Sequence, residues 1–405
     1  MRALLLRAAC TLGLLSLGLG ACGGAPTTAA AGSSDDSIIG GVDATGAKLN
    51  AIGTVGHKSF DDSFDYFCTA TLIAPTVVLT AKHCATRDPK SGRTMLDEEP
   101  IYFAVGPDST KPLKTVRVKS VLLSPVHDAG FVALGSDVAL YFLEAPIDDV
   151  TPLRVDGALL SELKVGQKFT AVGFGVRDRE RSSGQRKAGQ LTLQGVSGKP
   201  VQRVFPTYEE FAAFIAKHDG EDYVKAQEER MKKFYELELL KGYEAYLGLG
   251  ENDAQPCSGD SGGPLLARVK DENVVVAVVS GSFKGRTYPC SVVGEVYATF
   301  GPRVTELLDS ASPECAGVPV WGTCDEAGKV ATRCVSKREG PQRVNKIDCA
   351  ALGQVCKINA ENTAFCDDPP EPPPPPPPPA DAGPGDAGPS DAGAGDGGSA
   401  DAGPG

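Results

Sequence analysis

Between Ile38 and about Ala311 the chain is a succession of short β-branched runs, and this pattern limits the possible folds more than any other feature. Segments such as TLIAPTVVLTA, KTVRVKSVLL and VVVAVVSGSF have the composition of strands, and Gly, Pro and Asp separate them. Many short strands divided by turn residues are typical of an all-β barrel or sandwich. We therefore expect an all-β domain over residues 38–311.

Three segments within this domain carry residues suited to nucleophilic catalysis. LTAKHC contains His83, SDVAL contains Asp137, and CSGDSGGP contains Ser261. A serine hydroxyl is a weak nucleophile, so a neutral imidazole must take its proton and a carboxylate must orient that imidazole. The order His, Asp, Ser differs from the orders in subtilisins and α/β-hydrolases. We predict that His83, Asp137 and Ser261 form a catalytic triad.

The sequence around these residues resembles that of trypsin- and chymotrypsin-type serine peptidases. GDSGGP is complete, TAKHC stands for the usual Thr-Ala-Ala-His-Cys, and DVAL stands for Asp-Ile-Ala-Leu. IIGG at 38–41 resembles the Ile-Val-Gly-Gly start of the mature enzymes, and AVGFG at 171–175 resembles Val-Thr-Gly-Trp-Gly. The resemblance implies two six-stranded Greek-key barrels with the site between them. It also implies a serine endopeptidase that forms an acyl-enzyme on a protein or peptide substrate.

The same resemblance implies roles for further residues. The backbone N–H groups of Gly259 and Ser261 would form the oxyanion hole, and Ser280 would support Asp137. Cleavage before Ile38 would free an amine that pairs with Asp260 and completes the site. The segment Ser280, Gly281 and Ser282 would pair with the substrate backbone. Two disulfides are implied as well, Cys68–Cys84 and Cys257–Cys290.

Substrate preference is less constrained by the sequence. Gln255 corresponds to the floor of the specificity pocket, where an Asp would select Lys or Arg. Glu295 falls where the family usually has a wall glycine, so its carboxylate either attracts a basic side chain or fills the pocket and favours small residues. Gly281 replaces a usual Trp and is expected to leave the rim more open. Lys82 replaces an alanine, and its charge either disturbs His83 or points to solvent.

Residues 208–246 interrupt the strand pattern. They are rich in Glu, Lys and Ala, and apolar residues recur at helical spacing. We predict an inserted helical hairpin. It is either a solvated excursion whose apolar stripe packs on the barrel or an exosite that screens substrates.

The first 37 residues predict export. Arg2 and Arg7 precede an apolar stretch that is too short to span a bilayer as a mature helix. LGAC at 19–22 resembles the lipobox of bacterial lipoproteins, which implies a signal peptide over 1–21 and a lipid on Cys22. An ordinary signal peptide with an incidental cysteine is the alternative. Residues 22–37 would be a linker and activation peptide, and we expect an outer-membrane, periplasmic or cell-surface location, with release on activation.

Two further regions follow the all-β domain. Residues 312–368 form a cysteine-rich module, and residues 369–405, with a polyproline run and Asp-Ala-Gly repeats, are expected to be disordered. Without Cys10 and Cys22, ten of the 12 cysteines remain, an even number that suits disulfides in an oxidising compartment. We expect three disulfides within the module, although the sequence does not choose among their pairings. The six cysteines of the module are Cys315, Cys324, Cys334, Cys349, Cys356 and Cys366.

Two functions fit these observations. The first is an active serine endopeptidase, held at a membrane through Cys22 until it is activated. The second is a catalytically inactive homologue that binds a partner at the cell envelope. Because all three triad residues are present, the first is favoured. The formal net charge of −12 argues against a nucleic-acid partner. HExxH, EF-hand and phosphate-loop motifs are absent, so we expect no metal or cofactor.

Overall fold

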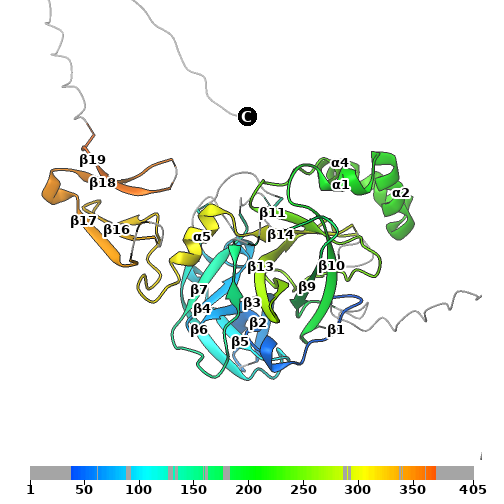
Figure 1. Cartoon of the computed structure of the whole chain (residues 1–405), viewed down its shortest axis with the longest axis horizontal. Coiled ribbons are helices and arrows are strands. Elements are labelled where there is room, and N and C mark those ends of the chain that lie inside the picture. The colour runs from blue at the N-terminus through cyan, green and yellow to red at the C-terminus, as the bar shows by residue number, and fades with distance from the viewer. Residues whose placement is uncertain are drawn as a thin grey trace, which may run out of the picture.

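The computed structural model describes residues 38–370 with short gaps, and it shows two β-barrels, a group of helices and a small module at the opposite end (Figure 1). The residues left out within this range are 62, 88–92, 126–130, 133–135, 158, 160–162, 177–182, 286–289, 291–292, 337–338, 340 and 361. The predicted signal peptide, the predicted lipid on Cys22, the predicted linker and most of the expected disordered tail therefore lie outside the described residues. Within those residues, no helix combines the length and the apolar character needed to cross a membrane.

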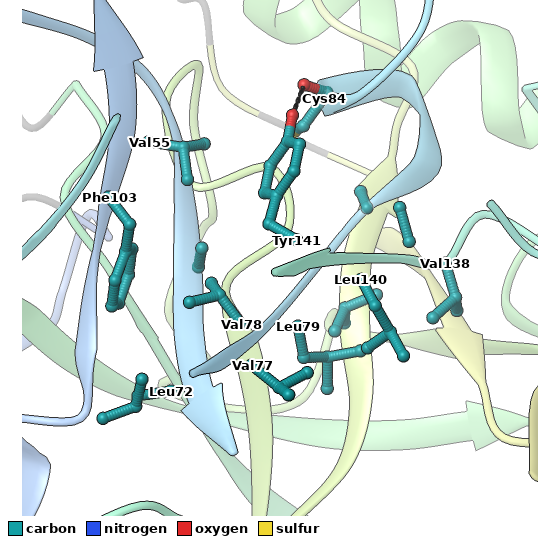
Figure 2. Close-up of a cluster of buried hydrophobic side chains, with 14 of the residues drawn as sticks. Val55, Leu72, Val77, Val78, Leu79, Cys84, Phe103, Val138, Leu140 and Tyr141 are labelled. Atoms are coloured by element: carbon teal, nitrogen blue, oxygen red, sulfur yellow. Dashed lines mark hydrogen bonds between the residues drawn. The ribbon is translucent and has the colours of Figure 1, made fainter. Parts of the chain in front are cut away.

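The first barrel is closed by six antiparallel strands in the order β2-β3-β4-β7-β6-β5. Its interior holds fully buried side chains from several strands, among them Leu72, Leu79, Phe103 and Leu140 (Figure 2). Strand β4 is buried along its whole length, and β7 is buried at four of its five positions. The strands are β2 (Ile52–Lys58), β3 (Phe64–Ala74), β4 (Val77–Thr80), β5 (Tyr102–Val105), β6 (Lys114–Leu123) and β7 (Ala139–Leu143).

The second barrel has the order β10-β11-β14-β13-β12-β9 and is closed by the pairing of β9 with β10. Two short strands lie outside this ring: β1 (Val42–Asp43) pairs with β10, and β8 (Arg154–Val155) pairs with β13. The two closed barrels confirm the predicted fold. The ring strands are β9 (Lys168–Gly173), β10 (Lys187–Gly195), β11 (Glu244–Leu247), β12 (Pro264–Val269), β13 (Glu272–Gly281) and β14 (Glu295–Thr299).

Strand β13 joins the two barrels through its two buried faces. Val275 and Val278 pack in the hydrophobic cluster of the first barrel, whereas Val276 and Val279 pack in that of the second. A strand buried on both faces reads as a continuous apolar run, which explains the sequence VVVAVV. The end of this strand is thereby fixed between the barrels, where the candidate site lies.

The insertion between β10 and β11 consists of four short helices rather than one hairpin. Thr207 caps the longest of them, because its Oγ1 accepts a hydrogen bond from the Glu210 N–H at 3.2 Å. The expected range of 208–246 was too late at both ends, since α1 begins at Pro200 and Glu244–Leu247 form strand β11. The helices are α1 (Pro200–Val204), α2 (Tyr208–Asp219), α3 (Glu221–Ala226) and α4 (Glu228–Tyr235).

The cysteine-rich segment follows helix α5 (Pro302–Asp309) and contains the three expected internal disulfides. Its first part shares the core of the first barrel: Val320 and Trp321 belong to the same buried cluster as Val304 and Leu307. Its strands are β15 (Thr323–Cys324), β16 (Val330–Cys334), β17 (Val344–Asp348), β18 (Val355–Ile358) and β19 (Ala364–Asp367). The disulfides are Cys315–Cys334, Cys324–Cys356 and Cys349–Cys366.

Candidate active site

The three predicted triad residues come from both barrels. His83 lies in the short 3-10 helix η2 (Lys82–Cys84) directly after β4, and Asp137 lies directly before β7. The disulfide Cys68–Cys84 ties η2 to strand β3. Ser261 lies in the turn that precedes β12 of the second barrel. His83 and Ser261 line the same pocket, which has a volume of about 420 Å³.

Asp137 holds His83 through two hydrogen bonds. The Nδ1–H of His83 donates to Oδ2 of Asp137 at 2.8 Å, and the backbone N–H of His83 donates to Oδ1 at 2.8 Å. Ser280 Oγ donates to Oδ2 at 2.7 Å. Burial raises the pKa of Asp137, but the charge and hydrogen bonds of His83 and the Ser280 hydroxyl bring the pKa below 3.8. The ionised carboxylate can only accept, so Nδ1 carries the proton and Nε2 is left as the acceptor.

In the turn around Ser261, two backbone N–H groups have no acceptor among the described residues. The N–H groups of Asp260, Gly262 and Gly263 donate to carbonyl oxygens, whereas those of Gly259 and Ser261 donate to no described residue. Gly259 has a φ of +100°, and a Cβ there would lie 2.9 Å from the Cα of Gly175. Only glycine fits this conformation and this close approach. Two such donors beside a serine hydroxyl could stabilise a negative oxygen, which is the role that the resemblance implies for them.

The cluster of Cys68, His83 and Cys84 brings potential metal-binding atoms within 4.8 Å of one another. Cys68 and Cys84 are joined in a disulfide, so their sulfurs are not thiolate ligands. This group of described residues therefore does not fit a metal ion.

Comparison with known proteins identifies the family of this chain. The family model described as Trypsin matches residues 38–300. The chain belongs to the trypsin family. It is 27% identical over 257 residues to a tryptase of Mus musculus, a match that covers 60% of this chain and 79% of the tryptase. It is 25% identical over 247 residues to the CLIP domain-containing serine protease B10 of Anopheles gambiae, covering 58% of this chain and 59% of the mosquito protein.

The start of the trypsin-family domain is packed inside the second barrel. Ile38 is only 1% exposed and belongs to that barrel's hydrophobic cluster, and Ile39 exchanges two backbone hydrogen bonds with Gln255. Asp260 is also fully buried. Its Oδ1 accepts from the Gly175 N–H at 2.7 Å and its Oδ2 from the Cys257 N–H at 2.8 Å. Burial nevertheless raises the pKa of Asp260 to about 6, which indicates a carboxyl group that lacks a full compensating charge.

The raised pKa of Asp260 predicts a specific dependence of stability on pH. The folded uncut chain holds this proton up to about pH 6, whereas the unfolded chain releases it near 3.8. The contribution of Asp260 to the free energy of unfolding should therefore be largest below pH 3.8 and be lost as the pH rises towards 6. Denaturant unfolding of wild type and Asp260→Asn at several pH values measures this contribution as the difference between the two chains. A difference that does not change between pH 4 and 6 would contradict the assignment.

The catalytic efficiency of a site built on His83 should fall as the pH decreases through neutrality. Burial lowers the pKa of His83, but the charge and hydrogen bond of Asp137 raise it, and the net pKa lies above 6.5. A general base acts only when it is neutral, so the fall should be centred above 6.5. Measuring kcat/KM from about pH 5 to 9 tests this expectation. A rate that is constant from pH 5 to 8 would require a different base.

The residues expected to set specificity separate into two groups. Ser280, Gly281, Ser282 and Glu295 line the pocket that holds His83 and Ser261. Gln255 lines a neighbouring hollow behind Pro256. Glu295 is 3% exposed, and burial raises its pKa to about 8, while Lys284 and Ser282 act in the opposite direction.

One sequence-based expectation about this pocket was wrong, and one of the two alternatives for Lys82 is excluded. Gly281 does not leave the rim open, because Phe131 and Val132 occupy the adjacent space; a Cβ on Gly281 would lie 3.0 Å from the Phe131 ring. Lys82 does not point to solvent. It is 1% exposed, and its Nζ donates to the Ser124 carbonyl oxygen at 2.8 Å. Burial lowers the pKa of Lys82 to about 8, against the opposing effect of Asp137.

Sequence reasoning missed two cationic residues of the trypsin-family pocket, Lys284 and Arg230. Lys284 follows Ser282 by two positions. Extending the predicted substrate-binding segment by two residues would therefore have included it. Arg230 comes from helix α4 of the insertion, which has no counterpart in the motifs of the family. No signal in the sequence places it at the site.

Proposed function

We propose that this protein is a serine endopeptidase that hydrolyses peptide bonds through an acyl-enzyme on Ser261. The observation that carries the proposal is the pairing of His83 with the ionised Asp137 beside Ser261 in one pocket. A buried carboxylate that fixes the imidazole tautomer is the arrangement that activates a serine hydroxyl.

The proposed reaction uses these groups in turn. His83 Nε2 takes the proton of Ser261 Oγ as the oxygen attacks the substrate carbonyl carbon, and Asp137 stabilises the imidazolium that forms. The Gly259 and Ser261 N–H groups stabilise the negative oxygen, a contribution of about 2.7–4 kcal/mol for each donor. His83 then gives its proton to the leaving amine. Water repeats the sequence on the acyl-enzyme and releases the second product.

A non-catalytic binding role is the alternative function. Lys82 is buried near Asp137, and the pocket differs from the usual family pattern at Gly281 and Glu295. These features favour a changed ligand more than a lost reaction, because none of them removes a hydrogen bond of the His83–Asp137 pair.

The cellular setting remains part of the proposal. We expect export, lipid attachment at Cys22 and a location at the bacterial outer membrane, in the periplasm or on the cell surface. Cleavage before Ile38 would create the activating amine, so the lipid-bearing form would be a zymogen. The substrates would be proteins or peptides.

Incubation of the processed chain with a peptide library, analysed by mass spectrometry, tests the activity. We expect internal cleavage of a subset of peptides at neutral pH and none with Ser261→Ala. Intact peptides after prolonged incubation with correctly folded, processed protein would contradict the proposal.

The cysteine-rich segment is expected to be dispensable for cleavage of short peptides. All proposed catalytic and pocket residues precede Val296, so deletion of residues 312–405 leaves them in place. The same deletion removes Val320 and Trp321 from the core cluster of the first barrel and should lower Tm by several degrees. Activity towards a short peptide, measured well below Tm, separates the two effects. Loss of activity in the folded truncated protein would show that the segment belongs to the catalytic unit.

A further inference from the structure

The inserted helices reach the pocket that contains Ser261. Arg230, on helix α4, lines this pocket together with His83 and Ser261. The helix is fixed there by aromatic contacts: the ring of Phe234 meets that of Phe131 edge-on at 5.6 Å, and the guanidinium of Arg230 lies 5.0 Å from the centre of the Phe283 ring. The insertion is therefore part of the pocket wall and not a remote excursion.

Lys284 supplies a second cation to the same pocket. Its Nζ donates to Ser258 Oγ at 3.1 Å. Ser258 precedes Ser261 by three residues, so the ammonium group lies beside the turn that carries Ser261. Among the described residues, no carboxylate forms a salt bridge with Arg230 or Lys284, although Lys284 interacts electrostatically with Asp260 and Glu295 and lowers the pKa of each. Arg230 and Lys284 both line the pocket and can therefore meet a ligand there.

Among the described residues that line the pocket, Glu295 is the one acid. It is buried in the wall, and desolvation raises its pKa to about 8, so the carboxyl group is mainly protonated near neutral pH. The preference for lysine or arginine considered from the sequence depended on an ionised Glu295 facing an empty neutral pocket. Arg230 and Lys284 reverse that charge balance.

The cationic character continues along helix α4. An adjoining hollow of about 220 Å³ shares Phe131, Arg230 and Ser282 with the pocket and adds Lys233 at its edge. Phe234, Leu237 and Phe283 form its apolar lining. An apolar groove bordered by Arg and Lys fits an extended peptide that carries carboxylates.

We propose that the pocket beside Ser261 takes an aspartate or glutamate side chain of the substrate, with Arg230 and Lys284 as its cationic partners. This inference rests on the proposed peptidase function and gives its substrate class. A lysine or arginine side chain in the same position meets two like charges in a partly desolvated site, which disfavours it. A carboxylate gains two charge-assisted hydrogen bonds there.

Peptide binding tests the proposal without depending on turnover. The processed chain that begins at Ile38 and carries Ser261→Ala is titrated calorimetrically with peptides that are identical except for Glu, Gln or Lys at one central position. We expect the Glu peptide to bind about tenfold more tightly than the Gln peptide, and the Lys peptide to bind most weakly. Arg230→Gln and Lys284→Gln should each reduce the Glu preference severalfold, and Arg230→Lys should retain most of it. Lys217→Gln removes an exposed charge from helix α2 outside the pocket and should leave the preference unchanged.

The outcomes separate this inference from the proposed function. Equal binding of the three peptides, tighter binding of the Lys peptide, or no measurable binding of any of them would overturn the carboxylate site. Hydrolysis by the wild-type chain without preference for acidic residues would leave the peptidase standing and overturn only the inference. A Glu preference that Arg230→Gln weakens, in a chain that hydrolyses nothing, would support the carboxylate site and overturn the peptidase.

Discussion

Replacement of Ser261 by alanine is expected to reduce kcat for peptide hydrolysis by about 10⁴–10⁶-fold. The change removes only the hydroxyl that attacks the carbonyl carbon. The backbone of the turn should be unaffected, because the Ser261 carbonyl oxygen still accepts from the Thr69 N–H at 2.9 Å and Gly262 still donates to Val279. Steady-state kinetics of wild type and variant on one cleavable peptide give the ratio.

Thr80→Val is a useful comparison, since Thr80 lies near the same turn and donates to the Thr69 carbonyl oxygen without touching the reacting atoms. We expect a modest loss of stability and nearly normal kcat. Near-normal turnover in Ser261→Ala itself would contradict the proposed mechanism.

Cleavage between Ser37 and Ile38 is expected to raise activity by about 10²–10⁴-fold and to release the protein from the membrane. The new amine would pair with the buried Asp260, whose charge is otherwise compensated only in part, by two backbone N–H groups and by Lys284. Buried pairs that lose one partner are destabilised by about 3–5 kcal/mol, which sets the size of the effect. Because the proposed lipid lies on Cys22 and no cysteine occurs from 23 to 37, nothing covalent would retain the severed segment.

Membrane fractionation with N-terminal sequencing of each pool measures this coupling. The soluble active pool should begin at Ile38, and the membrane pool should be inactive. Ser37 is neither Lys nor Arg, so an activating protease of other specificity is implied. Asp260→Asn should remain poorly active after the cut. Full activity in a lipid-bearing uncut chain would contradict the coupling.

The barrels and the main site residues were predictable because short motifs carry them. Short β-branched runs divided by Gly, Pro and Asp mark the barrel strands, and the flanks of His83, Asp137 and Ser261 are local in sequence. The contact between His83 and Asp137, at 2.8 Å, joins residues 54 positions apart and follows from the resemblance, not from composition.

Buried charged residues explain most of what sequence reasoning missed. Glu244 was read as part of a helix, yet it begins strand β11, where its carboxylate accepts from the Phe131 and Leu240 N–H groups. Arg186 is 1% exposed and donates to the carbonyl oxygens of Ala44 and Leu49. A charged residue is normally exposed to solvent. The buried exceptions can be recognised only from the groups that contact them in the folded chain.

The specificity pocket was the least predictable part because it is assembled from distant segments. Arg230 reaches it from the insertion, and Phe131 from the loop before Asp137. Their approach depends on the packing of α4 against Phe283, which no local pattern encodes.

Labelling with a fluorophosphonate tests the central claim most directly, because this reagent modifies only a serine whose oxygen is activated as a nucleophile. The processed, folded chain is treated at neutral pH, digested and mapped by mass spectrometry. We expect a single adduct on Ser261, strongly reduced labelling in His83→Ala, and none in Ser261→Ala. An unlabelled Ser261 in folded protein that begins at Ile38 would contradict the account and favour the non-catalytic binding role.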